Sequence, residues 1–145
     1  MQLTRYTDYS LRVLIYLAVH PDDLATIDEI AGAYAISRAH LMKVVHRLGL
    51  AGYIETIRGR GGGMRLARPP EEISVGEVVR CTEETMVLVE CFDPTTSQCR
   101  IEPACGLRGA LNDALEAFQR TLDGYTLADV VAHRRRPIAR LLAAS

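Results

Sequence analysis

The fold of this chain is decided by residues 26–50, TIDEIAGAYAISRAHLMKVVHRLGL. Thr26, followed three residues later by Glu29, fits a capping box that opens a short helix. After a turn, Ser37 caps a second helix that runs to about Leu50. Its apolar side chains recur on one face: Leu41, Val44, Val45 and Leu48. Two short helices joined by a tight turn, the second with basic residues on its outer face, indicate a helix-turn-helix.

Two short β-prone runs follow, residues 53–57 and 64–67, around Arg58-Gly59-Arg60-Gly61-Gly62-Gly63. This pattern predicts a hairpin, or wing, with a basic tip. A phosphate loop does not fit, because the P-loop needs Lys-Ser/Thr after its last glycine and the Rossmann pattern needs glycine where Met64 stands. The glycines instead favour close approach of the backbone to DNA between two arginines.

Charge is strongly segregated along the chain, although the net charge of the 145 residues is only −1. Residues 34–70 carry seven basic side chains against one acidic side chain, a net charge of +6. Residues 71–123 carry eleven acidic side chains against four arginines, a net charge of −7. The basic segment indicates either a binding face for an anionic partner or a solvated surface that is merely basic.

Composition narrows the class of protein. With 48% hydrophobic and 24% charged residues, the chain is neither mainly disordered nor collagen-like nor of low complexity. Its longest apolar run, residues 13–19, is much shorter than the ~18 residues that a membrane span needs. We therefore expect a cytoplasmic protein without a membrane partner. No Ser/His/Asp arrangement, nucleotide loop or paired-carboxylate site is recognisable, so we do not expect an enzyme.

Helical patterns flank the helix-turn-helix and wing. Residues 7–20 predict a first helix, residues 74–83 a linking helix, and Thr126 opens a last short helix. The most regular apolar stripe predicts a helix of ~24 Å over residues 107–122. Its candidate interface residues are Leu107, Leu111, Leu115, Phe118 and Leu122. We expect this stripe to form a homodimer, the alternative being that it packs on its own domain.

The expected fold class is therefore mainly α with a small β-hairpin: a winged helix-turn-helix DNA-binding domain plus a long C-terminal dimerisation helix. The DNA-binding region covers residues 1–70, with the helix-turn-helix at about 26–50 and the wing at 53–67. A linking helix and a cysteine loop cover residues 71–103. The dimerisation helix and the short C-terminal helix cover residues 104–132, and a mobile tail covers residues 133–145.

Three of the four cysteines, Cys91, Cys99 and Cys105, lie within fifteen residues in a segment rich in Pro, Thr and Ser. There is no Cys-x-x-Cys, and no histidine nearby could complete a zinc site. Three thiolates on a flexible loop suit an iron–sulfur cluster, which accepts varied ligand spacing, although they could also be ordinary buried thiols. The fourth, Cys81, lies in the linking helix, where we expect a small core residue.

Several segments, taken in order, carry a family resemblance. They are Leu3-Thr4-x-x-Thr7-Asp8-Tyr9-x-Leu11-Arg12, Ser37-Arg38-x-His40-Leu41-x-Lys43, Arg58-Gly59-x-x-Gly62-Gly63, the three-cysteine loop and Tyr125-Thr126-Leu127-Ala128-Asp129. Together they resemble the Rrf-type winged-helix regulators, and among these the repressors that sense nitric oxide. The resemblance covers residues 1 to about 132, and its specificity comes from the order of the segments.

The resemblance implies a homodimer in which Cys91, Cys99 and Cys105 of each subunit hold an iron–sulfur cluster, 4Fe-4S being favoured over 2Fe-2S. It also implies that Asp8 of the partner subunit supplies the fourth ligand; without the resemblance, Asp8 is a first-turn carboxylate that the helix dipole favours. Family members usually have four or five residues between the first two cysteines, and this chain has seven. Cluster-assembly regulators of the family have a histidine ligand where this chain has Arg108.

The resulting expectation is a repressor that binds a palindromic promoter site and loses affinity when nitric oxide reacts with its cluster. We expect contacts in the major groove from Ser37, Arg38, His40 and Lys43, and contacts to phosphates or the minor groove from Arg58 and Arg60. One alternative is a regulator of the same fold that senses iron or cluster supply. Another, of a different class, is a small iron–sulfur electron-transfer protein, which would leave the +6 segment unexplained.

Overall fold

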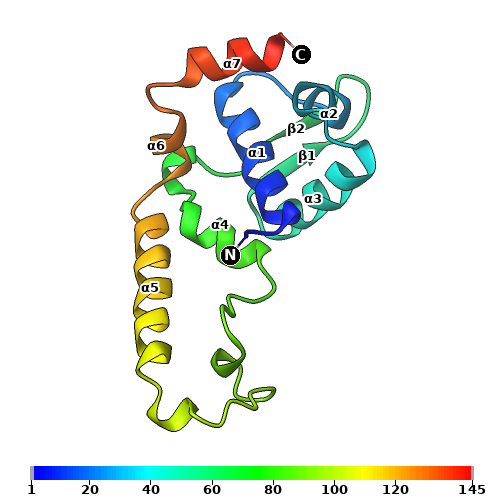
Figure 1. The fold of residues 1–145 in the computed structure, drawn as a ribbon. Helices are drawn as coiled ribbons and strands as arrows, with labels where there is room; N and C mark the ends of the chain where they lie inside the picture. The colour runs from blue at the N-terminus through cyan, green and yellow to red at the C-terminus, as the bar shows by residue number, and fades with distance from the viewer. Residues whose placement is uncertain (1, 145) are drawn as a thin grey trace.

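A computed structural model describes residues 2–144 of the chain and shows two parts, a helical body and an arm that projects from it (Figure 1). The body contains three helices and a two-stranded sheet from the N-terminal half: α1 (Arg5–Val19), α2 (Ile27–Tyr34), α3 (Arg38–Leu50), β1 (Ile54–Ile57) and β2 (Gly63–Leu66). It is completed by η1 (Pro70–Glu72), α4 (Val75–Thr82), α6 (Leu127–Val131) and α7 (Arg135–Ala143). The arm contains η2 (Glu90–Phe92), η3 (Glu102–Ala104) and α5 (Gly106–Asp123). Met1 and Ser145 lie outside the described residues.

The predicted helix-turn-helix is present, and the predicted caps begin its helices. The side chains of Thr26 and Glu29 each bond the other's backbone N–H, which completes the capping box of α2. Ala35 ends α2 in the left-handed conformation, with a φ of 52°, and so turns the chain tightly. The Ser37 hydroxyl accepts a hydrogen bond from the His40 N–H at the start of α3.

The predicted wing is an antiparallel hairpin in which Ile54 pairs with Leu66 and Ile57 pairs with Gly63. Two hydrogen bonds between Ala25 and Met64 attach β2 to the segment before α2. At the tip, a Cβ atom on Gly62 would stand 2.2 Å from the carbonyl oxygen of Ile57, so this turn requires glycine. The sequence therefore specifies both the tip and its attachment to the body.

Helix α1 lies at the centre of the body and packs against α3, α4, α6 and α7. Its buried side chains join those of the other elements in one core, of which the largest fully buried members include Leu14, Leu17, Ile30, Leu41 and Ile73. α1 begins two residues before the predicted start because the Thr4 hydroxyl caps it by accepting from the Thr7 N–H. The winged-helix elements are thus held by a single apolar core.

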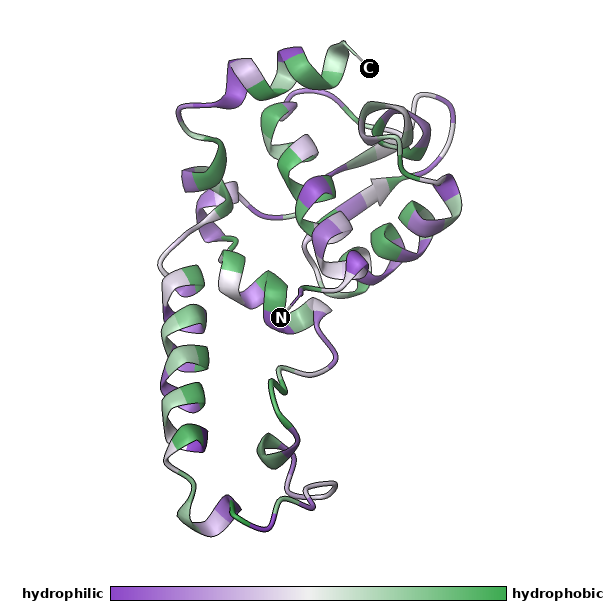
Figure 2. Ribbon diagram, viewed as in Figure 1, coloured by the Kyte–Doolittle hydropathy of each residue, from purple (hydrophilic) through white to green (hydrophobic). Residues whose placement is uncertain are grey.

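The arm, defined here as residues 83–126, contains no buried residue, whereas the rest of the described chain forms the body. α5 runs along the outer side of the arm (Figure 1), and the hydropathy colours show hydrophobic residues recurring along its length (Figure 2). Its C-terminal end is tied to α4, since Arg80 forms an ion pair of 2.7 Å with Asp123. Within residues 2–144, neither α5 nor any other helix is long and apolar enough to cross a membrane.

The prediction of a mobile tail over residues 133–145 is wrong for the part that forms α7. Ile138 and Leu142, one helical turn apart, pack against the core, and Arg135 Nε donates to the carbonyl oxygen of Val19 at 3.2 Å. Pro137 does not prevent the helix, because it lies in the first turn, where a backbone N–H has no intrahelical acceptor. The arginines at residues 134–136 led to the prediction of a solvated tail, whereas residues 135–143 form a short amphipathic helix.

The prediction that Cys81 is a core residue is also wrong, because its side chain is exposed. The buried face of α4 carries Val78, Val79 and Thr82. At about 100° per residue, Cys81 lies roughly 100° around the helix from the centre of that face. Neighbouring apolar residues in the sequence were therefore not enough to predict that Cys81 is buried, because it lies on a different face of the helix.

Candidate nucleic-acid interface and cysteine loop

The outer face of α3 is a stripe opposite the core residues Leu41, Val44, Val45 and Leu48. Ala39, Lys43 and His46 lie along this stripe at spacings of four and three residues, and all three are exposed. Sequence reasoning selected Lys43 and missed Ala39 and His46. A helical projection centred on the apolar stripe would have found both, since both lie opposite it.

The other predicted DNA contacts at the start of α3 are the exposed residues Ser37, Arg38 and His40. Each of them contacts another side chain of the same subunit. Ser37 Oγ lies 2.9 Å from Nδ1 of His40. The His40 ring lies 6.2 Å from the ring of Tyr9 on α1. Arg38 forms an ion pair of 3.2 Å with Asp28 on α2. These contacts fix the first turn of α3 relative to α1 and α2.

The seven basic residues of the +6 segment divide into two groups. Four have a partner within the body: Arg38 with Asp28, Arg47 over the Tyr6 ring, Arg65 with Glu55, and Arg68 over the Tyr53 ring. The other three, Lys43, Arg58 and Arg60, are exposed and have no ion pair or hydrogen bond with any residue in the described range 2–144. Those three cations are available for phosphates.

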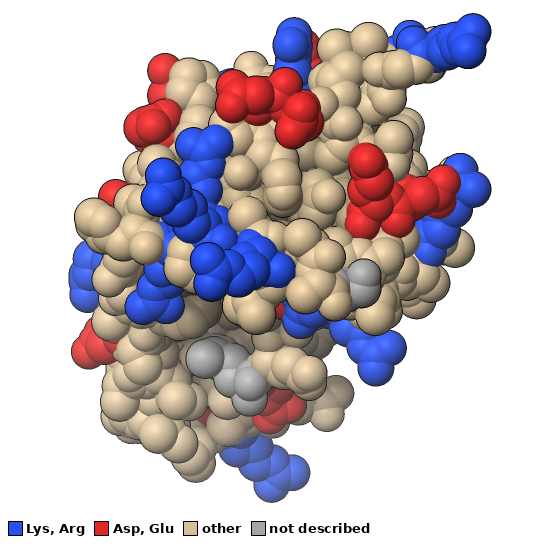
Figure 3. Space-filling view, turned by 90° about the horizontal axis from the view of Figure 1, so that it is seen from above, with Lys and Arg blue, Asp and Glu red and all other residues tan. Residues whose placement is uncertain are grey.

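A second basic surface lies on α7, where Lys and Arg side chains gather in a cluster (Figure 3). Its exposed members are Arg134, Arg135, Arg136 and Arg140. From the sequence alone these residues were expected in a mobile tail and not on a structured surface. The docking of α7 gives the cluster a fixed position.

The three cysteines of the arm are free thiols of intermediate exposure, and none lies within an α-helix or a β-strand. Cys91 is in η2, Cys99 is in the loop that follows, and Cys105 directly precedes α5. Within residues 2–144, no three His, Cys, Asp or Glu side chains surround a common metal position. The chain thus places three soft ligands in one loop but does not bring them together as a ready-made site.

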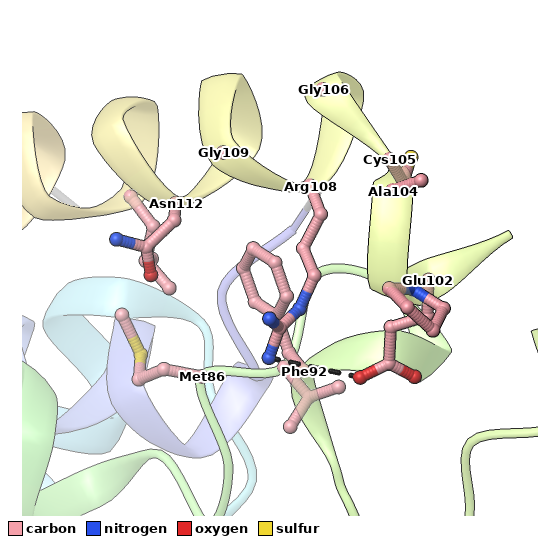
Figure 4. Close-up of a pocket in the computed structure, with 12 residues that line it drawn as sticks. Met86, Phe92, Glu102, Ala104, Cys105, Gly106, Arg108, Gly109 and Asn112 are labelled. Carbon is pink, nitrogen blue, oxygen red and sulfur yellow. Dashed lines mark ion pairs between the residues drawn. The ribbon is translucent and has the colours of Figure 1, made fainter.

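A hollow of about 880 Å³ separates this loop from α5 (Figure 4). Its walls include Met86, Phe92 and Cys105. Arg108 extends from the first turn of α5 into the hollow and points towards Glu102 (Figure 4). Sequence reasoning noted Arg108 only as the residue in place of a histidine, and the structure places it in the hollow with Cys105, where its Nε donates to the carbonyl oxygen of Cys91.

Asp8 lies in the first turn of α1 and is half-exposed. In its own subunit it pairs with Arg12, and the closest oxygen–nitrogen distance is 2.8 Å. The guanidinium of Arg12 also lies 5.9 Å from the ring centres of Tyr9 and Tyr34. The structure places Asp8 near the helix-turn-helix of its own subunit and does not bring it into its own cysteine loop.

A carboxylate at the start of the arm holds the N-terminus. Glu83 accepts hydrogen bonds from the backbone N–H of Thr4 at 2.8 Å and from its hydroxyl at 3.1 Å. Burial alone would raise the pKa of Glu83, but hydrogen bonds from Thr7 and Thr4 outweigh this effect and hold its pKa below the usual value. The ionised carboxylate thus ties α1 to the end of α4.

The predicted dimer stripe lies on α5 and is only partly covered by its own subunit. Leu107 is 65% exposed, and the other four candidates are partly buried. A shallow apolar groove beside the stripe contains Leu3, Leu115 and Phe118 among its walls. Uncovered apolar side chains at helical spacing are typical of a surface that another protein surface covers.

A winged helix-turn-helix with unpaired cations on its recognition helix and wing defines a class, the DNA-binding transcriptional regulators. The family described as "Iron-dependent Transcriptional regulator" (Rrf2) matches residues 3–133 of the chain. The chain therefore belongs to the Rrf2 family. Because this is a family of transcriptional regulators, the expectation that the chain is not an enzyme is confirmed.

The chain is similar to the HTH-type transcriptional regulator NsrR of Bacillus subtilis (strain 168), with 57% identity over 135 residues, which cover 92% of each chain. Among solved structures, a putative transcriptional regulator from Listeria innocua is 29% identical, with a TM-score of 0.78, covering 92% of this chain and 88% of that one. CymR, the global cysteine regulator of B. subtilis, is 27% identical, with a TM-score of 0.76, covering 92% and 98%. These likenesses confirm the predicted fold class.

Proposed function

We propose that the protein is a homodimeric repressor that binds a palindromic promoter site in the cytoplasm. An iron–sulfur cluster that reacts with nitric oxide would control its affinity for DNA. The observation that carries this proposal is the presence, in one chain of the Rrf2 family, of three free thiols in one loop and three unpaired cations on a winged helix. The similarity to NsrR over 92% of the chain supports it.

The cysteine loop fits a cluster by the chemistry of its donors. Cys91, Cys99 and Cys105 are soft sulfur ligands, none is in a disulfide, and their backbone, which forms no α-helix or β-strand, can adjust around a metal group. A fourth ligand would come from Asp8 of the partner subunit. A bound 4Fe-4S cluster would supply iron open to nitric oxide at the position held by the carboxylate, which is the most exchangeable of these ligands.

The residues around Asp8 offer a route from the cysteine loop to the DNA-binding face. When Asp8 is not engaged elsewhere, it holds Arg12, which in turn lies over Tyr9 and Tyr34. Tyr9 contacts His40 in the first turn of α3. A change in the partner of Asp8 therefore alters the contacts of Arg12 beside both helices of the helix-turn-helix. A coupling of about 1–3 kcal/mol would change DNA affinity about 5–150-fold.

At the DNA, each subunit would read one half-site. Ser37, Arg38, His40 and Lys43 would face the major groove, and Arg58 and Arg60 would reach phosphates or the minor groove. Pairing of the α5 helices would set the distance between the two recognition helices. Since half-site spacing is a geometric requirement, a small change at the dimer centre would lower affinity.

The test is operator binding by anaerobic protein before and after addition of nitric oxide, followed together with its absorption and EPR spectra. A variant with all three cysteines of the loop replaced by alanine should lose both the cluster and tight binding. Cys81→Ala is the matched control, since its thiol is exposed on α4 outside the loop. Binding that still responds to nitric oxide in the triple variant would overturn the proposal.

A second candidate function, sensing of iron or cluster supply, is favoured by the description of the family as iron-dependent. Titrating the same holoprotein with nitric oxide and, separately, with an iron chelator separates the two. Loss of operator binding at stoichiometric nitric oxide, with chelator slow to act, would favour the first function. Rapid loss of operator binding with the chelator, with little response to nitric oxide, would favour sensing of iron or cluster supply. The electron-transfer alternative gains no support from membership of a family of transcriptional regulators.

A further inference from the structure

The seven residues between Cys91 and Cys99 do not form an extended loop. Asp93 Oδ1 accepts hydrogen bonds from the N–H of Thr95 at 2.9 Å and from its hydroxyl at 2.6 Å, and Oδ2 accepts from the Thr96 hydroxyl at 3.0 Å. The carbonyl oxygen of Asp93 also accepts from the Ser97 N–H at 3.0 Å. Residues 93–97 therefore form one closed turn.

The turn shortens the path between the two cysteines. Four extended residue steps would span about 13 Å, whereas a helix-like turn closed by a bond between residues four apart advances roughly 6 Å. The Asp93 turn thus takes up about 7 Å of chain. The seven residues between Cys91 and Cys99 therefore span a distance that a shorter segment could also span.

A second set of contacts joins the segments that carry the cysteines. Arg108 Nε donates to the carbonyl oxygen of Cys91 at 3.3 Å. The same guanidinium lies 3.8 Å from Oε1 of Glu102. The other oxygen of Glu102 accepts a hydrogen bond of 2.5 Å from the Ser97 hydroxyl. We call Arg108, Glu102 and Ser97 the clasp.

The clasp reaches each of the three cysteines through the backbone. Arg108 lies three residues after Cys105 and holds the backbone at Cys91. Ser97 lies two residues before Cys99 and is bonded to Glu102, which itself lies between Cys99 and Cys105. Arg108 thus contacts η2 and Glu102 directly, the latter as drawn in Figure 4, and Glu102 extends the connection to Ser97 before Cys99.

We propose that Arg108 and Glu102 are positioning residues that hold the three cysteine-bearing segments together, while the Asp93 turn takes up the extra length of the loop. This inference rests on the proposed function, because it takes the three thiols as cluster ligands. Arg108 acts here through the backbone and contributes no ligand. It occupies the position where a histidine ligand stands in cluster-assembly regulators of the family.

The first experiment uses the full chain without cluster. Hydrogen–deuterium exchange by mass spectrometry would compare wild type with Arg108→Gln, with α3 as an internal reference. We expect amides of residues 91–105 to exchange at least about threefold faster in the variant, since a charge-assisted, partly exposed set of contacts is lost. Arg100→Gln is the matched control, an exposed arginine of the same loop with no hydrogen bond or ion pair to any residue between 2 and 144.

Two further variants test the chemistry of the contacts. Arg108→Lys keeps the positive charge but loses the planar set of guanidinium donors. Its exchange rate over residues 91–105 should therefore lie between those of wild type and Arg108→Gln. Asp93→Asn keeps an acceptor oxygen for Thr95, so it should leave the turn closed, whereas Asp93→Ala should open it. The rate of thiol alkylation, with Cys81 as the reference thiol, gives a second readout for the same variants.

The second experiment measures iron and sulfide bound after anaerobic reconstitution. We expect Arg108→Gln to hold at least about threefold less cluster than Arg100→Gln, with Arg108→Lys intermediate. Unchanged exchange in Arg108→Gln would overturn the clasp whether or not wild type binds a cluster. Faster exchange with full cluster content would overturn the positioning role. Faster exchange in a chain whose wild type takes up no cluster would support the clasp and overturn the proposed function.

Discussion

Every buried residue of the described chain belongs to the body, and none of residues 83–126 in the arm is buried. In the body, α1 packs against four other helices around one apolar core. The arm is not poor in apolar residues, since Leu107, Leu111, Leu115, Phe118 and Leu122 lie along α5. The body therefore buries its own apolar side chains, whereas the arm leaves its apolar side chains and thiols exposed or only half-buried, where we propose that a second subunit and a cluster bind.

The largest expected effect comes from a cavity in the body. Leu14 is fully buried, so Leu14→Ala should lower the free energy of unfolding by about 2–5 kcal/mol. Ile101→Ala, at a side chain of the arm that is 66% exposed, should change it by less than about 0.5 kcal/mol. Urea unfolding at one protein concentration measures both. Equal losses would show that the arm is packed as tightly as the body.

The next effect concerns assembly. Phe118→Lys places a charge in the proposed α5 interface and should weaken dimerisation by about 2 kcal/mol or more, about 30-fold in dissociation constant, while the body stays folded. Glu116→Lys is the control, because Glu116 is exposed on the other side of α5. Sedimentation equilibrium gives both constants. A Phe118→Lys chain that dimerises like the control would contradict the proposed interface.

A smaller effect is expected at the wing. Arg58→Ala and Arg60→Ala should each weaken binding to a promoter fragment, and each should reduce the slope of log affinity against log salt by about 1. Arg65→Ala should leave the slope nearly unchanged, since Arg65 is already paired with Glu55. Fluorescence anisotropy at several salt concentrations measures the slopes. If Arg65→Ala has the same effect as the tip variants, the division of the cations is incorrect.

The smallest effect lies where body and arm meet. The pKa of Glu83 in the folded chain is lower than its usual value, so its hydrogen bonds to Thr4 and Thr7 stabilise the fold above the unfolded pKa and are lost as pH falls through the folded pKa. Glu83→Gln should therefore melt slightly below wild type at neutral pH. The difference should shrink as the pH falls through the folded pKa and vanish below it, where the wild-type carboxyl is protonated. A difference that persists in acid would mean that packing, and not charge, causes it.

Most of the body could be predicted because its signals are local. Thr26, Ser37 and Ser74 each cap the helix that the sequence predicts, and the glycines of the wing fall where the turn requires them. α7 was not predicted because its stability comes from tertiary packing. Its apolar residues Ile138 and Leu142 pack against the core, and the helix contacts α1 and α2.

The contacts of the candidate sites could not be read from the sequence, because they join residues far apart in the chain. Arg38 and Asp28 are brought together by the turn between α2 and α3, and Arg108 meets the backbone of Cys91 across the whole loop. The sequence predicted which residue types gather in each segment. Which cations are neutralised and which remain available depends on the packing of the helices.

The positions of the two chain ends have a practical consequence for anyone who produces this protein. The N-terminal residues Gln2 and Leu3 line the groove that also contains Leu115 and Phe118, next to the proposed dimer interface. α7, the last described helix, lies at the opposite end of the molecule from the cysteine loop (Figure 1). An affinity tag or fluorescent label therefore belongs at the C-terminus, where it leaves the groove and the thiols undisturbed.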